Sequence, residues 1–273
     1  MDITVDGHRV FAHTGGRPFD RARPVLVLIH GAGCDHTMWG LQTRYFAHHG
    51  FSVLAFDLPG HGRSEGTPPA TVDEYAAWLW RAVDAAGAGA AGRIALAGHS
   101  MGSLIALAAA DAVPARTGAL VLVGVAAHMQ VHADLIAAAT VDDATAFDAI
   151  TDWGLGRAAH IGGHQAPGLW FGGGERALLA ASRPGVLASG LIACNDYTGG
   201  PEAAARVSCP VLIIVGAGDR MTPPRTVEPL VGALSDVRVE TLADTGHMIM
   251  VERPNETIDL MADFLPSAFA AEI

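Results

Sequence analysis

Residues 93–104 of the chain read RIALAGHSMGSL, and their pattern is the most informative one for the fold. An apolar, strand-like run leads directly into a Gly-x-Ser-x-Gly pattern, which is followed by small residues typical of a closely packed helix. This order predicts a strand that turns sharply into a helix, with Ser100 on the turn. Gly98 and Gly102 stand two residues before and after the serine, where only glycine fits comfortably. We therefore expect the hydroxyl group of Ser100 to stand clear at one edge of a sheet.

Strand and helix patterns alternate on both sides of this unit. Continuous apolar runs that suit strands buried on both faces occupy residues 24–29, 52–56, 93–97, 119–123 and 211–215, with a weaker one at 237–242. Helical patterns occupy residues 38–49, 72–86, 103–112, 225–234 and 255–264. Asp6-Gly7, between two alternating segments, predicts a hairpin at the N-terminus. The alternation predicts an α/β fold: a mostly parallel central sheet of about eight strands with helices on both faces.

One long segment breaks this rhythm. Residues 126–206 contain no buried-strand pattern and are rich in Ala, Gly, His and Trp. Residues 131–140 and 144–151 have helical patterns, whereas the glycine-rich stretch 154–174 is expected to be irregular. Long segments of this kind inside a compact domain usually form functional lids. We therefore expect a helical cap at 126–206, inserted after the sixth strand into a core domain made of residues 1–125 and 207–273.

Composition limits the classes of function. The 273 residues, half of them apolar and 16% charged, suit one large ordered domain. The net charge of −11, without a block of like charges, argues against binding to nucleic acid or to anionic membranes. Three scattered cysteines, Cys34, Cys194 and Cys209, form no disulfide framework or metal-type spacing. Because the N-terminus lacks the pattern of a signal peptide and no apolar run reaches about 18 residues, we expect a cytoplasmic protein without a membrane span.

A serine hydroxyl is a weak nucleophile and needs a neighbouring base. His247 is the best candidate, because it lies on a loop just after the last expected strand, in the sequence LADTGHM. His48 and His49 end a helix, and His99 stands inside the serine turn, where we expect its ring to point elsewhere. We therefore assign His247 as the general base for Ser100.

The base in turn needs an acid that orients it, which should lie between the serine and the histidine in chain order. Asp219 fits, because it stands on the turn after the strand at 211–215. Asp244 is a weaker rival: it lies only three positions before His247, and two residues so close in one loop rarely meet through the far nitrogen of the imidazole. Asp219 is therefore the expected acid.

Backbone N–H groups are expected to stabilise the negative charge that develops on a substrate carbonyl. Met101, directly after the serine, supplies one of them. Ala32, in the glycine-containing loop His30-Gly31-Ala32-Gly33, supplies the other, because the glycines let the backbone approach a ligand closely.

Together these motifs resemble the α/β-hydrolase superfamily over nearly the whole chain. The shared pieces are His30-Gly31-x-Gly33, Asp57-Leu-Pro-Gly-His-Gly-x-Ser64, the Gly98–Gly102 turn, Gly216-x-x-Asp219 and Gly246-His247. The resemblance implies a cap after the sixth strand, no metal and no organic cofactor. It also implies a tight, well-packed loop for the Asp57–Ser64 motif, so Asp57 and His61 are not assigned to catalysis. The chain resembles small capped esterases, lactonases and carbon–carbon bond hydrolases about equally.

The expected activity is that of a serine hydrolase that cleaves a carboxylic ester, or a related carbonyl group, of a small to medium and mostly apolar compound through an acyl-enzyme on Ser100. The same three residues also suit a non-hydrolytic or carbon–carbon bond-cleaving reaction, and a ligand-binding protein is a further alternative. The candidates for a substrate pocket are Trp39, Trp153, Trp170 and Met248, although packing explains each equally well.

A metal site is not expected. His160 and His164 have the spacing of a metal pair on a helix, but the two glycines between them argue against a helix, and a third ligand is not evident. The expected partner is a small-molecule substrate alone.

Overall fold

The computed structural model describes residues 1–90, 92–163 and 168–269. Its centre is an eight-stranded sheet with the order β1-β2-β4-β3-β5-β6-β7-β8. The strands are β1 (Asp2–Val5), β2 (His8–His13), β3 (Val25–Ile29), β4 (Ser52–Phe56), β5 (Ile94–His99), β6 (Thr117–Val123), β7 (Val211–Gly216) and β8 (Val237–Leu242). β1 and β2 form the predicted hairpin, β2 pairs antiparallel with β4, and the other neighbouring strands run parallel. The predicted α/β fold with a mostly parallel sheet is confirmed.

Alternate residues of the central strands enter two separate hydrophobic cores. In β3, Val25, Val27 and Ile29 belong to the core on one face of the sheet. Leu26 and Leu28 belong to the core on the other face. A strand that is buried on both faces needs apolar side chains at every position, which explains why the central strands form continuous apolar runs.

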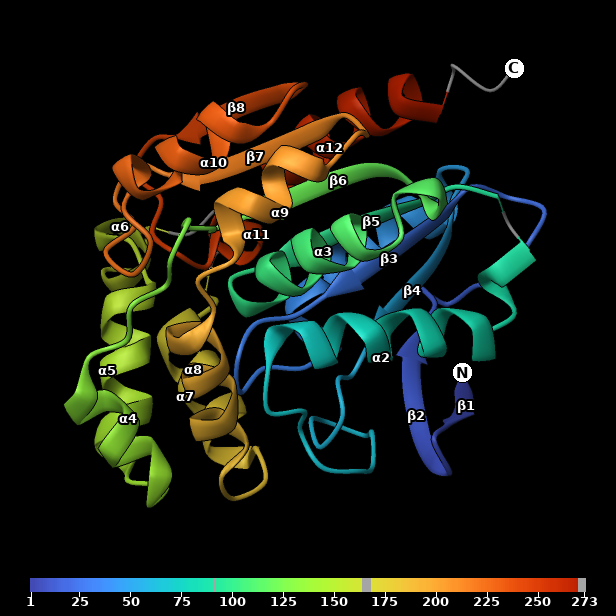
Figure 1. Cartoon of the computed structure of the whole chain (residues 1–273). Coiled ribbons are helices and arrows are strands. Elements are labelled where there is room, and N and C mark those ends of the chain that lie inside the picture. The colour runs from blue at the N-terminus through green and yellow to red at the C-terminus, as the bar shows by residue number, and fades with distance from the viewer. Residues whose placement is uncertain (91, 164–167, 270–273) are drawn as a thin grey trace.

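Helices cover both faces of the sheet (Figure 1). The first face carries α2 (Val72–Ala85), α3 (Met101–Ala112), α9 (Gly200–Arg206) and α10 (Glu228–Ala233). The second face carries α1 (Gly40–His48), α11 (Ile249–Glu252) and α12 (Pro254–Phe269). Short 3-10 turns are η1 (His36–Trp39), η2 (Ala88–Ala90), η3 (Pro114–Arg116) and η4 (Pro224–Val227). α2, α3, α9 and α10 pack successively against one another, and α12 packs against α1, β6 and β7.

Two expected helices are divided in the structure. The segment expected at 38–49 begins as η1, capped by the carboxylate of Asp35, which accepts the N–H of Thr37 at 2.8 Å, and then continues as α1. The segment expected at 225–234 is divided into η4 and α10, each with a proline at its start. Proline lacks the N–H group that would continue a helix from the preceding turn.

The chain between β6 and β7 contains the helices α4 (Ala133–Thr140), α5 (Ala144–Gly154), α6 (Arg157–His160), α7 (Phe171–Ala181), α8 (Val186–Asp196) and α9. Within the described part of this segment no strand forms. The expectation that 154–174 is irregular is partly wrong, because α6 and the start of α7 lie inside it. At the start of α7 a Cβ on Gly173 would lie 2.3 Å from the ring of Trp170, so a side chain at this position would displace that exposed ring.

Helices α4, α5, α7 and α8 lie together beside the sheet, at the left of Figure 1. α4 packs against α5 and α8, and α5 packs against α7. By contrast, α9 packs against α3 and α10, which belong to the layer on the sheet. We therefore propose that the cap consists of α4 to α8, and that α9 belongs to the core domain although residues 126–206 were expected to form the cap.

The composition predicts no disulfide framework and no membrane span. Cys34, Cys194 and Cys209 are buried free thiols. None of the described helices is by itself long and apolar enough to cross a membrane, and α7 with α8 reaches that length and apolarity only as a pair bent by 99°.

Candidate active site

Ser100 stands between β5 and α3, as the sequence predicts. Its backbone has φ +54° and ψ −122°, a strained conformation for a residue with a side chain. A Cβ on Gly98 would lie 2.0 Å from the carbonyl oxygen of Gly102, and a Cβ on Gly102 would lie 2.3 Å from that of Ile29. Both glycines are therefore required, because the turn leaves no space for a side chain on either side of the serine.

Asp219 and His247 meet at the ends of β7 and β8. The Oδ2 atom of Asp219 lies 2.8 Å from Nδ1 of His247, and both side chains are buried. Burial alone would raise the pKa of Asp219, but the charge and hydrogen bond of His247 and the hydrogen bonds from Thr222 outweigh it and hold the pKa below its ordinary value. Asp219 is thus an ionised acceptor for the imidazole. The rival Asp244 is exposed on the surface.

The opposite nitrogen of His247 is buried and unoccupied. Nε2 has no hydrogen-bond partner among the described residues. Because Nδ1 faces a carboxylate, Nδ1 carries a proton and Nε2 is left as a free acceptor. Ser100 and His247 line the same cavity, so the serine and the base belong to one site.

Thr222 holds the acid, a role that was not expected from the sequence. Its hydroxyl donates to Oδ2 of Asp219 at 2.6 Å and lies 3.2 Å from Nδ1 of His247. The backbone N–H groups of Met221 and Thr222 both donate to Oδ1 at 2.8 Å. A threonine three residues after a turn aspartate is a common local hydrogen-bonding pattern and is the signal that would have identified it.

The expectation that His99 points away from the site is wrong. Its Nε2 lies 3.0 Å from the carbonyl oxygen of His247, which only accepts, so Nε2–H is the donor. Burial, with a smaller effect from the charge of His247, lowers the pKa of His99 to about 3 and keeps the ring neutral. His99 therefore fixes the backbone that carries the imidazole, a contact between β5 and the loop after β8 that only the folded chain reveals.

The loop after β3 approaches the serine closely. A Cβ on Gly31 would lie 3.3 Å from Cβ of Ser100. His30 holds this loop: its Nδ1–H donates to the carbonyl of Gly31 at 2.8 Å, and its Nε2 accepts the N–H of Leu58 at 3.1 Å. Ala32 lines the cavity beside Ser100, whereas Met101 is fully buried at the start of α3. The arrangement is compatible with N–H donors from Ala32 and Met101, whose oxyanion role stays a prediction.

The Asp57 loop is tightly packed. Oδ1 of Asp57 accepts the N–H and the ring nitrogen of His36 at 2.8 Å each, and Oδ2 accepts the N–H of Arg63 at 2.8 Å. Asp35, His36 and Asp57 form a close group of possible ligands, but these hydrogen bonds already occupy Asp57. Of the histidine pair considered from the sequence, His160 is exposed, and His164 lies outside the described residues.

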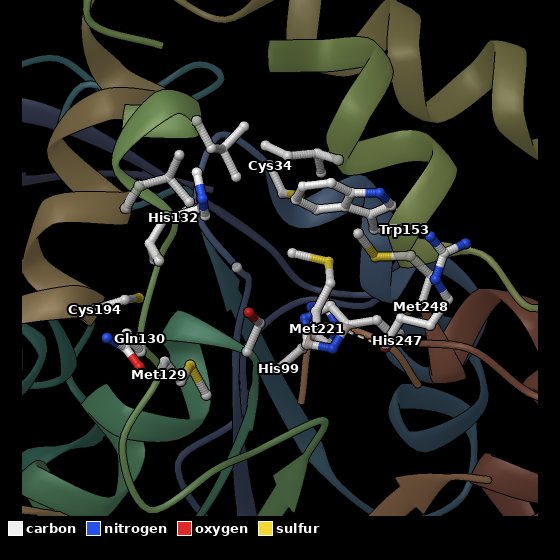
Figure 2. A pocket seen from close by; sticks show the side chains of 18 residues that line it. Cys34, His99, Met129, Gln130, His132, Trp153, Cys194, Met221, His247 and Met248 are labelled. Atoms are coloured by element: carbon white, nitrogen blue, oxygen red, sulfur yellow. Dashed lines mark hydrogen bonds between the residues drawn. The ribbon is translucent and has the colours of Figure 1, made fainter. Parts of the chain in front are cut away.

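The cavity above Ser100 has a volume of about 310 Å³. Most of its wall is made of apolar and sulfur-containing side chains from the cap and the core, as Figure 2 shows. Trp153 and Met248 line it, as expected for pocket residues. Trp39 does not, because it is fully buried in the core on the second face of the sheet. Trp170 is 75% exposed and packs over the start of α7, so both of these assignments are corrected.

Two buried glutamates, Glu252 and Glu175, lie near the histidine loop and the cap, and one of them connects the two. Glu252 accepts the N–H groups of Gly156 and Gly246, each at 3.0 Å, and so ties the end of α5 to the residue before His247. Glu175, on α7, is also buried, and neither of its carboxyl oxygens has a partner among the described residues. Burial, with a smaller effect from Glu252, raises the pKa of Glu175 to about 8. Neither glutamate was distinguishable in the sequence from a surface residue.

Replacing Glu175 by glutamine is expected to remove a loss of stability that the wild type undergoes as the pH rises toward 8. The unfolded chain releases this proton near pH 4.5, whereas the folded chain keeps it up to about pH 8. The stability of the wild type therefore falls as pH rises from about 4.5 to about 8, by roughly 1.4 kcal/mol per pH unit at most. The melting temperature of Glu175→Gln should exceed that of the wild type at pH 8 and approach it at pH 5.

The matched control is Glu202→Gln, which removes an exposed carboxylate from α9. Its melting temperature should follow the wild type at every pH. If Glu175→Gln and the wild type lose stability in parallel between pH 5 and pH 8, Glu175 is not a buried neutral acid.

Known proteins resemble this chain over most of its length. Residues 26–260 match the profile described as "Alpha/beta hydrolase family". The pimeloyl-[acyl-carrier protein] methyl ester esterase of Aromatoleum aromaticum is 30% identical over 258 residues, which cover 88% of this chain and 98% of that protein. The (E)-2-((N-methylformamido)methylene)succinate hydrolase of Acinetobacter baylyi is 27% identical over 250 residues, covering 87% and 85%. The solved enol-lactonase from Burkholderia xenovorans aligns with a TM-score of 0.86 at 22% identity, covering 97% of this chain and all of that one.

Proposed function

Because this chain belongs to the alpha/beta hydrolase family, we propose that it is a serine hydrolase that cleaves carboxylic esters, or related carbonyl compounds such as lactones, of small and mostly apolar substrates. The observation that carries the proposal is the arrangement at His247. Asp219 binds one nitrogen of the imidazole at 2.8 Å, the other nitrogen has no partner among the described residues, and His247 lines the same cavity as Ser100. A strained serine beside an oriented, unoccupied base suits nucleophilic catalysis.

The chemistry follows from these positions. His247 takes the proton of Ser100 as the serine oxygen attacks the substrate carbonyl, and Asp219 stabilises the imidazolium that forms. The N–H groups of Ala32 and Met101 hold the oxyanion. His247 then gives its proton to the leaving alcohol, which departs and leaves an acyl group on Ser100. Water, activated by His247, repeats these steps on the acyl-enzyme and releases the acid.

Ester cleavage is favoured over other hydrolytic reactions by two observations. The relative from Aromatoleum aromaticum is named as a methyl ester esterase, and the alignment with this chain covers 98% of that protein. The cavity of about 310 Å³ is lined mainly by apolar side chains, which suits a small acyl or alkyl group. A preference between open esters and lactones would depend on the cap.

The proposal is tested by trapping the acyl group with hydroxylamine. Ethyl, phenyl and p-nitrophenyl butyrate form the same butyryl-enzyme after the leaving group has departed. The ratio of butyryl hydroxamate to butyrate should therefore be the same for all three esters, although their rates differ. A ratio that changes with the leaving group would mean that water attacks the ester directly. If no ester is turned over, the proposal is wrong and ligand binding or a different reaction must be sought.

A further inference from the structure

Among the described residues that line the cavity, one carries a permanent charge, although the protein as a whole has a net charge of −11. Among the described lining residues, Arg220 is the only arginine, and none is an aspartate or glutamate. Apart from the histidines His99, His132 and His247, the remaining lining residues are apolar, sulfur-containing or uncharged polar. Arg220 is therefore the permanent positive charge that a ligand in this mostly apolar cavity can meet.

The backbone on both sides of Arg220 is fixed by the catalytic acid. Arg220 directly follows Asp219, whose Oδ1 accepts the N–H groups of Met221 and Thr222 at 2.8 Å. The hydrogen bonds that hold Asp219 thus also fix the backbone of Arg220 relative to Asp219 and His247. A specificity residue placed in this way keeps its register with the reacting atoms.

The guanidinium of Arg220 is largely unused within the protein. Its one described hydrogen bond is a long one of 3.4 Å, from Nη1 to the carbonyl oxygen of Asp152 near the end of α5. Arg220 forms no ion pair with a described residue, whereas ion pairs with aspartate or glutamate occupy Arg9, Arg23, Arg81, Arg116, Arg176, Arg206 and Arg238. A guanidinium has five N–H donors, so most of those of Arg220 are available to a ligand.

An anionic group that enters an apolar cavity loses water and needs a partner of opposite charge. The planar fork of a guanidinium matches a carboxylate with two parallel hydrogen bonds. Ser100 and Arg220 line one cavity of about 310 Å³, so a small molecule can contact both at once. We propose that Arg220 is an anion-recognition residue, and that the preferred substrates are esters or lactones that carry a free carboxylate away from the reacting carbonyl. The part of this proposal that concerns turnover rests on the proposed function.

The kinetic test compares two substrates of nearly equal shape. Monomethyl glutarate ends in a carboxylate, and methyl 4-carbamoylbutanoate ends in the neutral amide. The wild type should favour the anionic ester in kcat/KM by about tenfold or more, as for a charge-assisted hydrogen bond. Arg220→Gln should abolish the preference mainly by raising KM for the anion, and Arg220→Lys, which keeps the charge without the fork, should retain part of it.

Arg225→Gln is the matched control. It removes the same charge from η4, the turn that follows the loop of Arg220, at an exposed position that does not line the cavity. Its preference for the anionic ester should equal that of the wild type. If the wild type uses both esters equally, or if Arg225→Gln loses the preference as Arg220→Gln does, the proposed recognition by Arg220 is wrong.

A binding measurement separates this proposal from the proposed function. In the Ser100→Ala background, where turnover through the serine is absent, monomethyl glutarate should raise the melting temperature more than the amide does. Adding Arg220→Gln should remove that difference. Carboxylate-dependent binding without any ester turnover would support the role of Arg220 and refute the esterase proposal. Equal shifts for both compounds would refute the role of Arg220, whatever the enzyme hydrolyses.

Discussion

Replacing Ser100 by alanine is expected to lower kcat for p-nitrophenyl butyrate by about 10⁴- to 10⁶-fold, because the acyl-enzyme route then lacks its nucleophile. The remaining rate would come from the oxyanion donors and from binding alone. The substitution removes one hydroxyl and leaves the glycine-flanked turn between β5 and α3 unchanged. Stability should therefore be nearly that of the wild type, and the loss should appear in kcat.

Ser208→Ala is the matched control, since Ser208 is an exposed serine just before β7. Its kcat should equal that of the wild type. Melting temperatures of both variants establish that they are folded. A folded Ser100→Ala protein that retains more than a few per cent of wild-type kcat would contradict the assignment of Ser100.

Replacing Asp219 by asparagine is expected to lower kcat by about 10⁴-fold, although the two side chains have nearly the same shape. The amide of asparagine presents donors where the carboxylate only accepts. It therefore no longer holds the proton on Nδ1 of His247, the contact that leaves Nε2 free as a base. It also replaces the acceptor of the Thr222 hydroxyl.

Asp244→Asn provides the comparison, because Asp244 lies three residues before His247 but is exposed. We expect its kcat to stay within about twofold of the wild type, as for most surface substitutions. The steady-state kcat of the two variants, measured with the same ester, decides between them. A larger loss in Asp244→Asn than in Asp219→Asn would reverse the assignment of the acid.

Sequence patterns predicted the features that depend on residues close together in the chain. Gly98 and Gly102 are needed wherever a strand turns into a helix around a serine, because each would collide with a neighbouring carbonyl if it carried a side chain. The continuous apolar runs predicted the central strands, since residues such as Val27 and Leu28 enter opposite cores. The fold and the order Ser100, Asp219, His247 follow from such features.

Features that depend on packing between distant segments could not be predicted. Trp39 and Trp153 both lie in apolar surroundings in the sequence, yet the first is buried under the sheet and the second lines the cavity. His99 contacts the backbone of His247, 148 residues away. The absence of any described partner for the carboxyl group of Glu175 becomes visible only when α7 is placed against the core.

Labelling with a fluorophosphonate probe shows whether Ser100 is an activated nucleophile. We expect the intact mass of the wild type to increase by one probe adduct, located on the peptide that contains Ser100, with hydrolysis of p-nitrophenyl butyrate lost in parallel. Ser100→Ala should gain no adduct. A wild-type protein that stays unlabelled while its cavity still binds small molecules, or an adduct on another residue, would contradict the account.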